Sequence, residues 1–308
     1  MKKYLNVYFG DSRTYFCMTE TTAKGVELKY VKSLKLIPDF DDGVFSDAGF
    51  QYDLSEVTSE IVEDIEGIIP VIPFNQIFTS LMPSPKNLTN EELRKLFKLE
   101  LRQNFPDRAY EDFSAYCVAL KMRTDGENYI LGLFIKNKVE EICKGFLSPF
   151  NSTVFEIVLP QIATVSAYYL NYPENADKLT ALLLLGFNYS SLTICKGKDI
   201  LYYSEINFEN HLQVIENLQR EMEKTRDLIK GNYDNLILHG EALTPMILEE
   251  YKKVFSNKFP FIGRLNAFRM LTTRLGNEYR EYCNRMAHVY PACIGGGMKE
   301  NSGIIKVI

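Results

Sequence analysis

The feature that most constrains this chain is a succession of short β-rich runs and helical segments that occurs twice. The β-rich runs are residues 4–9, 13–19, 26–33, 179–186, 189–196 and 199–206. Runs of this length, bounded by Gly, Asn or Asp turns, are typical of strands joined in a meander. Segments with helical periodicity follow each meander, so the sequence predicts a duplicated α/β (α+β) fold with two related lobes.

A different pattern separates the two lobes. Residues 89–92 (Thr-Asn-Glu-Glu) form a capping box, in which the Thr89 hydroxyl and the Glu92 carboxylate satisfy each other's free backbone amides. The helix that starts there ends before Pro106. Two β-rich runs and a further helix follow, so we expect a small α-β-β-α insert.

The predicted organisation has three parts. The first lobe covers residues 1–83 and is completed by 150–175 and the tail 290–308. The insert covers residues 84–149, and the second lobe covers residues 176–289.

Composition and residue spacing argue against several classes of function. The net charge of −5 comes without a concentrated Lys/Arg segment, which argues against a nucleic-acid partner. The longest apolar run, 181–185, is too short to cross a bilayer, and no signal peptide is visible. The six cysteines form no CxxC pair and the three histidines lack zinc-ligand spacing, so we expect reduced thiols and no metal site. The chain is therefore predicted to be cytoplasmic and to approach a membrane only through a partner.

Three segments carry a resemblance to a known family. Residues 88–106, residues 110–113 (Tyr-Glu-Asp-Phe) and residues 158–167 resemble the insert, and the strand and helix after it, in the PilM proteins of type IV pili, which are related to FtsA. The resemblance implies an actin-like (ribonuclease H-like) two-lobed fold.

In active members of that superfamily, an aspartate two residues before each turn glycine holds hydrated Mg²⁺, which prefers hard oxygen ligands. Here Tyr8 and Leu184 stand at those two positions, and Glu241 replaces the second glycine of the adenosine-binding pair. A carboxylate facing inward there would crowd a nucleotide. The resemblance therefore implies neither a catalytic residue nor a cofactor.

An alternative remains open, because backbone amides and hydroxyls can bind phosphate without carboxylates. The residues of such a degenerate nucleotide cleft are Gly10, Asp11, Ser12, Gly186, Asn188, Ser190 and Gly240. With them, the chain would be an ATP-binding actin-like protein with an atypical Mg-ATP site.

PilM proteins take up a short segment of a membrane-anchored partner beside the insert. By resemblance, Leu93, Phe97, Phe105 and Phe113 would line that groove, or else they form the insert's own core. We expect a non-enzymatic scaffold at the inner-membrane face of a pilus or secretion apparatus that binds the tail of a membrane-anchored protein. Two alternatives stay open at this point. The chain could form a homo-oligomer, and it could be an actin-fold protein of unassigned role.

Overall fold

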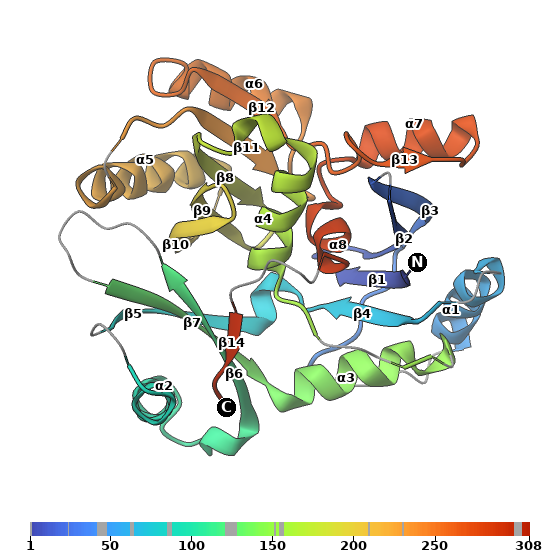
Figure 1. Ribbon diagram of the computed structural model, residues 1–308, viewed down its shortest axis with the longest axis horizontal. Helices are drawn as coiled ribbons and strands as arrows, with labels where there is room; N and C mark the ends of the chain where they lie inside the picture. The colour runs from blue at the N-terminus through green and yellow to red at the C-terminus, as the bar shows by residue number, and fades with distance from the viewer. Residues whose placement is uncertain are drawn as a thin grey trace.

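The computed structural model describes residues 2–23, 25–41, 48–61, 65–84, 88–120, 128–150, 152–153, 157–208, 210–229, 231–298 and 304–308. Within these residues, the strands form two five-stranded sheets and one four-stranded sheet, with helices packed around them (Figure 1).

The first sheet has the order β13-β3-β2-β1-β4. Its strands are β1 (Lys2–Phe9), β2 (Thr14–Thr22), β3 (Gly25–Leu34), β4 (Gly67–Val71) and β13 (Thr272–Thr273). The strands β1, β2 and β3 form an antiparallel meander, and β4 runs parallel to β1. The helix α1 (Ala48–Glu60) connects β3 to β4 along the chain.

The second sheet repeats this arrangement, with the order β10-β9-β8-β11-β12. Its strands are β8 (Leu179–Leu185), β9 (Ser190–Lys196), β10 (Asp199–Ile206), β11 (Asn235–His239) and β12 (Phe261–Arg264). Here β8, β9 and β10 are the meander, and β11 runs parallel to β8. The predicted duplicated α/β fold is therefore confirmed.

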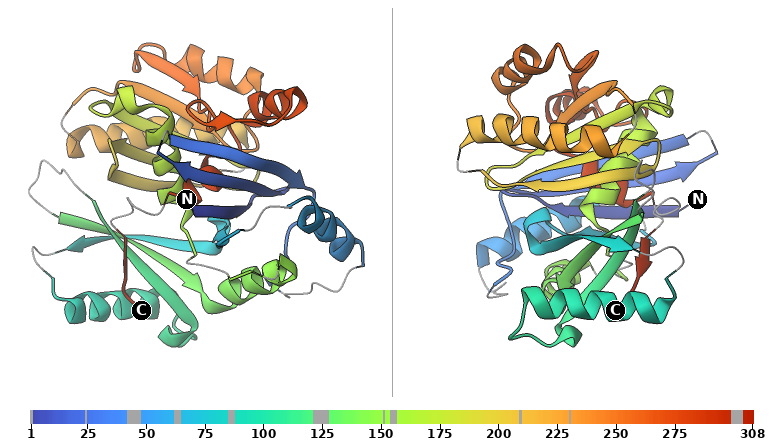
Figure 2. Two further views of the ribbon diagram at one scale, coloured as in Figure 1. Left: turned by 45° about the vertical axis from the view of Figure 1, so that its right-hand side comes forward. Right: turned by 90° about the vertical axis from the view of Figure 1, so that its left-hand side faces the viewer.

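The third sheet belongs to the insert and has the order β14-β6-β7-β5. Its strands are β5 (Ile77–Ser84), β6 (Phe113–Leu120), β7 (Asn128–Lys136) and β14 (Ile304–Lys306). The helix α2 (Asn90–Asn104) begins at the predicted capping box and packs its apolar side onto this sheet. Figure 2 shows the insert as a layer below the two lobes.

The remaining α-helices are α3 (Asn137–Leu147), α4 (Pro160–Asn171), α5 (His211–Leu228), α6 (Pro245–Phe255), α7 (Asn277–Met286) and α8 (Pro291–Gly296). The short 3-10 helices are η1 (Phe74–Gln76), η2 (Tyr110–Asp112), η3 (Ser148–Phe150) and η4 (Pro173–Asn175). Among the described residues, no helix is long and apolar enough to cross a membrane.

The helices α4 and α8 pack tightly against each other, and α8 also packs against β1 (Figure 1). A Cβ atom at Gly295 would overlap with the backbone carbonyl of Ala163 in α4. The absence of a side chain at Gly295 therefore lets α8 approach the backbone of α4 closely.

Sheet pairing differs from the predicted boundaries at three places. Residues 77–83, assigned to the first lobe, lie in β5 of the insert sheet, and the end of the tail pairs as β14 with β6. The strand β13, within the predicted second lobe, extends the first sheet along β3. In each case a strand edge with free backbone groups accepts a segment from elsewhere in the chain.

The two β-rich runs predicted in the insert pair antiparallel as β6 and β7. Residues 121–127, between these strands, lie outside the described residues.

A candidate anion cleft between the lobes

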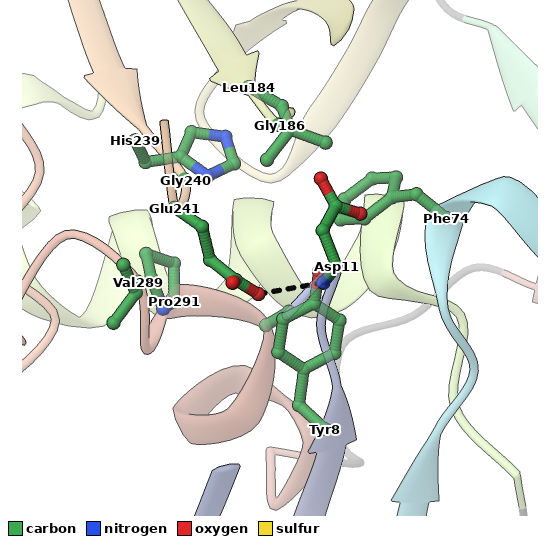
Figure 3. Close-up of a pocket in the computed structure, with 11 residues that line it drawn as sticks. Tyr8, Asp11, Phe74, Leu184, Gly186, His239, Gly240, Glu241, Val289 and Pro291 are labelled. Carbon is green, nitrogen blue, oxygen red and sulfur yellow. Dashed lines mark hydrogen bonds between the residues drawn. The ribbon is translucent and has the colours of Figure 1, made fainter. Parts of the chain in front are cut away.

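The corresponding turns of the two lobes have the same local structure. After β1, the backbone N–H of Gly10 donates to the carbonyl of Arg13, with 2.9 Å between N and O. After β8, the N–H of Gly186 donates to the carbonyl of Tyr189, at 2.8 Å. These turns face each other across a cleft, and the segment after β11 forms a third wall (Figure 3).

Glu241 projects from the third wall into the first turn (Figure 3). Its Oε1 accepts a hydrogen bond from the backbone N of Asp11 at 2.7 Å, and its Oε2 accepts one from the backbone N of Ser12 at 3.0 Å. The Ser12 hydroxyl also donates to Oε2. A carboxylate therefore fills the group of donors that a phosphate would use in this kind of turn.

The carboxylate of Asp11 accepts a hydrogen bond from the second turn in the same way. Its Oδ2 accepts a hydrogen bond from the backbone N of Phe187 at 2.8 Å. The first turn therefore supplies amides to the carboxylate of Glu241 and supplies its own carboxylate to the second turn. The two lobes are joined by contacts between carboxylates and backbone amides.

The glycines of the turns make room for these carboxylates. A Cβ at Gly10 would overlap with Oε1 of Glu241, and a Cβ at Gly186 would overlap with Oδ2 of Asp11. Gly240 has φ +110°, a conformation that residues with side chains rarely adopt, and it positions Glu241 next in the chain. The glycines predicted to approach a phosphate are thus in contact with the protein's own carboxylates or with backbone.

The space left in the cleft is small. The cavity has a volume of about 20 Å³, which holds about one water molecule. Its lining residues are Tyr8, Asp11, Phe74, Leu184, Gly186, His239, Gly240, Glu241, Val289, Pro291 and Ala292. A cavity of this volume is too small to enclose a nucleotide.

Burial dominates the electrostatics of the cleft. Burial raises the pKa of Glu241, the charge of Asp11 raises it further, and the hydrogen bonds from Ser12 and from the first-turn amides oppose the rise. Burial likewise raises the pKa of Asp11, against hydrogen bonds from the second-turn amides. Burial and then His288 lower the pKa of His239 to about 3, so this imidazole is neutral at pH 7.

The residues present do not fit a magnesium nucleotide. The two positions at which the family resemblance expects metal carboxylates hold Tyr8 and Leu184, and both line the cavity. The Tyr8 ring stacks on Tyr15, with 6.0 Å between centroids. Among the described residues, no group of three or more His, Cys, Asp or Glu side chains is placed to hold a metal.

The predicted cleft residues are only partly brought together. Gly10, Asp11, Ser12, Gly186 and Gly240 meet as described above, and the backbone amide of Asn188 also bonds to the Asp11 carboxylate although the residue is exposed. Ser190 is buried in β9. Glu241 was not among the predicted binding residues, although its place in a glycine position was the signal that could have identified it.

The four predicted partner-binding residues lie in the core of the insert. Leu93, Phe97 and Phe113 are buried, and Phe97 is fully inaccessible. Phe105 is partly buried and packs on Phe78 and Phe113, with ring centroids 5.1 Å apart in each pair. The alternative that these side chains form the insert's own core therefore describes this structure.

No protein-family model matches the chain, and no curated protein matches it. Several solved structures do match the chain. A chain of the PilM-PilN type IV pilus biogenesis complex matches with a TM-score of 0.73 and 12% identity, covering 96% of this chain and 98% of that chain. A Bacteroides thetaiotaomicron protein with an actin-like ATPase fold and unknown function matches with a TM-score of 0.50 and 11% identity, covering 86% of this chain and 91% of that chain.

The protein therefore has the actin-like ATPase fold, as its sequence predicted. Within this class its architecture is PilM-like, because the match to the pilus complex extends over both lobes and the insert. The relationship to FtsA stays a prediction.

Proposed function

We propose that this protein is a scaffold on the cytoplasmic face of an envelope assembly, such as a type IV pilus or a secretion system. It binds the cytoplasmic part of a membrane-anchored partner and does not hydrolyse ATP. The observation that carries the proposal is the match, over nearly the whole length of both chains, to a component of a pilus biogenesis complex.

The cleft supports the second half of the proposal. Hydrolysis by this fold depends on carboxylates that hold Mg²⁺ beside the phosphates, and Tyr8 and Leu184 cannot replace them. The carboxylate of Glu241 also occupies the amides of the first turn. A triphosphate would have to displace this carboxylate and overcome repulsion from Asp11.

The partner is tested by crosslinking cells that express the tagged chain and purifying the tagged chain from detergent-solubilised membranes. We expect one membrane-anchored protein to be recovered, and its isolated cytoplasmic segment to bind the purified chain directly. Failure to recover any membrane protein, with the tagged chain intact and folded, would contradict the scaffold proposal.

The second candidate function is ATP binding at an atypical site. It is favoured by the two preserved turns, whose amides are arranged around carboxylates and could accept phosphate oxygens. Isothermal titration with Mg-ATP separates the two functions. We expect no binding, whereas micromolar binding abolished by Asp11→Ala would favour the alternative.

A further inference from the structure

A second cavity lies where the helix α7 and the strand β13 adjoin β3 at the edge of the first sheet (Figure 1). Its volume is about 200 Å³. None of its lining residues lines the cavity between the lobes, so the two sites are separate. This pocket is therefore a feature of the sheet edge and not an extension of the cleft.

The deeper wall of the pocket is apolar. Leu28 of β3 and Cys283 of α7 are buried, and Phe268, Leu271 and Leu275 are half-buried beside them. Burial raises the pKa of the Cys283 thiol to about 11, so this side chain is uncharged at pH 7. The wall therefore favours an apolar occupant.

The volume sets the size of that occupant. In another protein, a dry cavity of about 150 Å³ lined by Leu, Ile and Phe side chains takes up benzene. The pocket at α7 is somewhat larger and has a wall of the same chemistry. One aromatic ring with a short substituent therefore matches both the volume and the wall.

The polar groups of the pocket are Thr273 and three exposed side chains of α7, which are Tyr279, Arg280 and Asn284. The Thr273 hydroxyl is already engaged, because it donates to a carbonyl of β3 at 3.0 Å and accepts from the backbone N of Leu275 at 3.1 Å. Within the described part of the chain, Arg280 forms no ion pair. Its guanidinium is therefore the charged group that a ligand in the pocket would meet.

The carboxylates on the elements beside the pocket are directed elsewhere. Those of β3 and α1 are paired with other basic residues: Glu27 with Lys29 and Arg274, and Glu56 and Glu60 with Lys32. On α7, the helical period places Glu278 and Glu281 away from the face that lines the pocket. Arg280 can therefore accept an external carboxylate, whose two oxygens match the planar guanidinium.

We propose that this pocket binds a small aromatic carboxylic acid. The ring lies against the apolar wall, and the carboxylate lies on Arg280 at the rim. Such a ligand contacts β3 and α7 at the same time, so it holds the helix against the edge of the first sheet. The site is independent of the scaffold function proposed above.

The test uses para-fluorophenylacetate as the probe and fluorine NMR of the probe as the measurement. We expect saturable binding to the full chain with a Kd of about 1 mM or lower, which is typical of a ligand of this size. Para-fluorotoluene, which has the ring without the carboxylate, should bind about tenfold more weakly. Para-fluorobenzylamine, which carries a positive charge, should bind more weakly than either.

Three variants locate the ligand. Arg280→Gln should weaken binding of the acid about tenfold and leave binding of the neutral compound unchanged. Arg285→Gln removes the same charge from an exposed position of α7 that does not line the pocket, so it is the matched control and should change neither. Cys283→Phe places a ring inside the cavity and should abolish binding of both compounds.

Each outcome bears on the proposal. No saturable binding of the acid to the folded, unaltered chain would overturn it. Equal weakening by Arg280→Gln and Arg285→Gln would reduce the effect to general charge attraction and overturn the contact with Arg280. A Cys283→Phe chain that is folded by circular dichroism and binds the acid as tightly as the unaltered chain would exclude the pocket. If this variant does not fold, the two arginine variants still decide.

Discussion

The carboxylate of Glu241 accepts a hydrogen bond from the backbone N–H of Asp11, with 2.7 Å between N and Oε1, although 230 positions separate the two residues. Asp11 in turn places its own carboxylate on the amide of Phe187 in the other lobe. Each carboxylate fills a turn that could otherwise bind an external anion. The cleft is therefore closed by the protein's own anions, and two testable consequences concern this contact directly.

Removal of the Glu241 carboxylate should create an anion site. Glu241→Ser leaves the amides of Asp11 and Ser12 without their acceptor, so we expect inorganic phosphate to bind with a Kd of about 1 mM. Phosphorus NMR or isothermal titration measures this binding. Glu249→Ser, which removes an exposed carboxylate paired with Lys252, is the matched control and should bind no phosphate.

The stability contribution of Glu241 should depend on pH in a defined direction. Burial raises its pKa in the folded state, so the folded protein holds the proton more tightly than the unfolded chain. Its contribution is therefore complete below the unfolded pKa and is lost as the pH rises through the folded pKa. We expect the free energy of unfolding, relative to Glu241→Gln, to increase as the pH is lowered from 7 towards about 4.5.

Glu60→Gln is the control of opposite sign for this pH experiment. Burial raises the pKa of Glu60, but hydrogen bonds from Lys32 and Tyr30 outweigh burial and lower the pKa overall. The contribution of Glu60 should be present above its unfolded pKa and be lost as the pH falls. Urea unfolding at several pH values measures both variants, and parallel pH dependences would contradict the assigned shifts.

Phe97 should stabilise the insert and have no direct role at its surface. Its side chain is fully buried between α2 and the sheet, so Phe97→Ala should lower the free energy of unfolding by about 3–5 kcal/mol. Leu99→Ala lies on the same helix at a position that is 55% exposed, and should change stability by less than about 0.5 kcal/mol. Chemical denaturation compares the free energies of unfolding of the two variants. A small effect of Phe97→Ala would contradict the core role, and Phe97 would again be a candidate residue of a partner groove.

Gly295 should tolerate no side chain. Gly295→Ala places a Cβ against the carbonyl of Ala163, so α8 must move from α4 and stability should fall by about 1–3 kcal/mol or more. Gly276→Ala, where a Cβ meets nothing within 4 Å, should cost less than about 1 kcal/mol. Thermal unfolding followed by circular dichroism compares the stability of the two variants. Equal losses of stability would show that the contact between α8 and α4 does not cause the effect of Gly295→Ala.

Local patterns were sufficient for much of the fold. The alternating runs predicted both meanders, and the capping box at Thr89 predicted the start of α2. These features depend on interactions between residues close in sequence, which the chain displays directly. The resemblance to the actin-like superfamily also identified Tyr8 and Leu184 as the residues at the two positions where metal carboxylates are expected.

Only the tertiary structure decided how distant segments meet. The contact between Glu241 and Asp11, the addition of β13 to β3 and the seating of β14 on β6 join residues whose separation in sequence leaves no local trace. Backbone amides and strand edges accept any suitable acceptor or extended segment, so their partners are set by which elements the packing brings together. For this reason the sequence by itself determined the two lobes and the start of α2, while packing determined that the protein's own carboxylates close the cleft and that its own tail pairs with the insert.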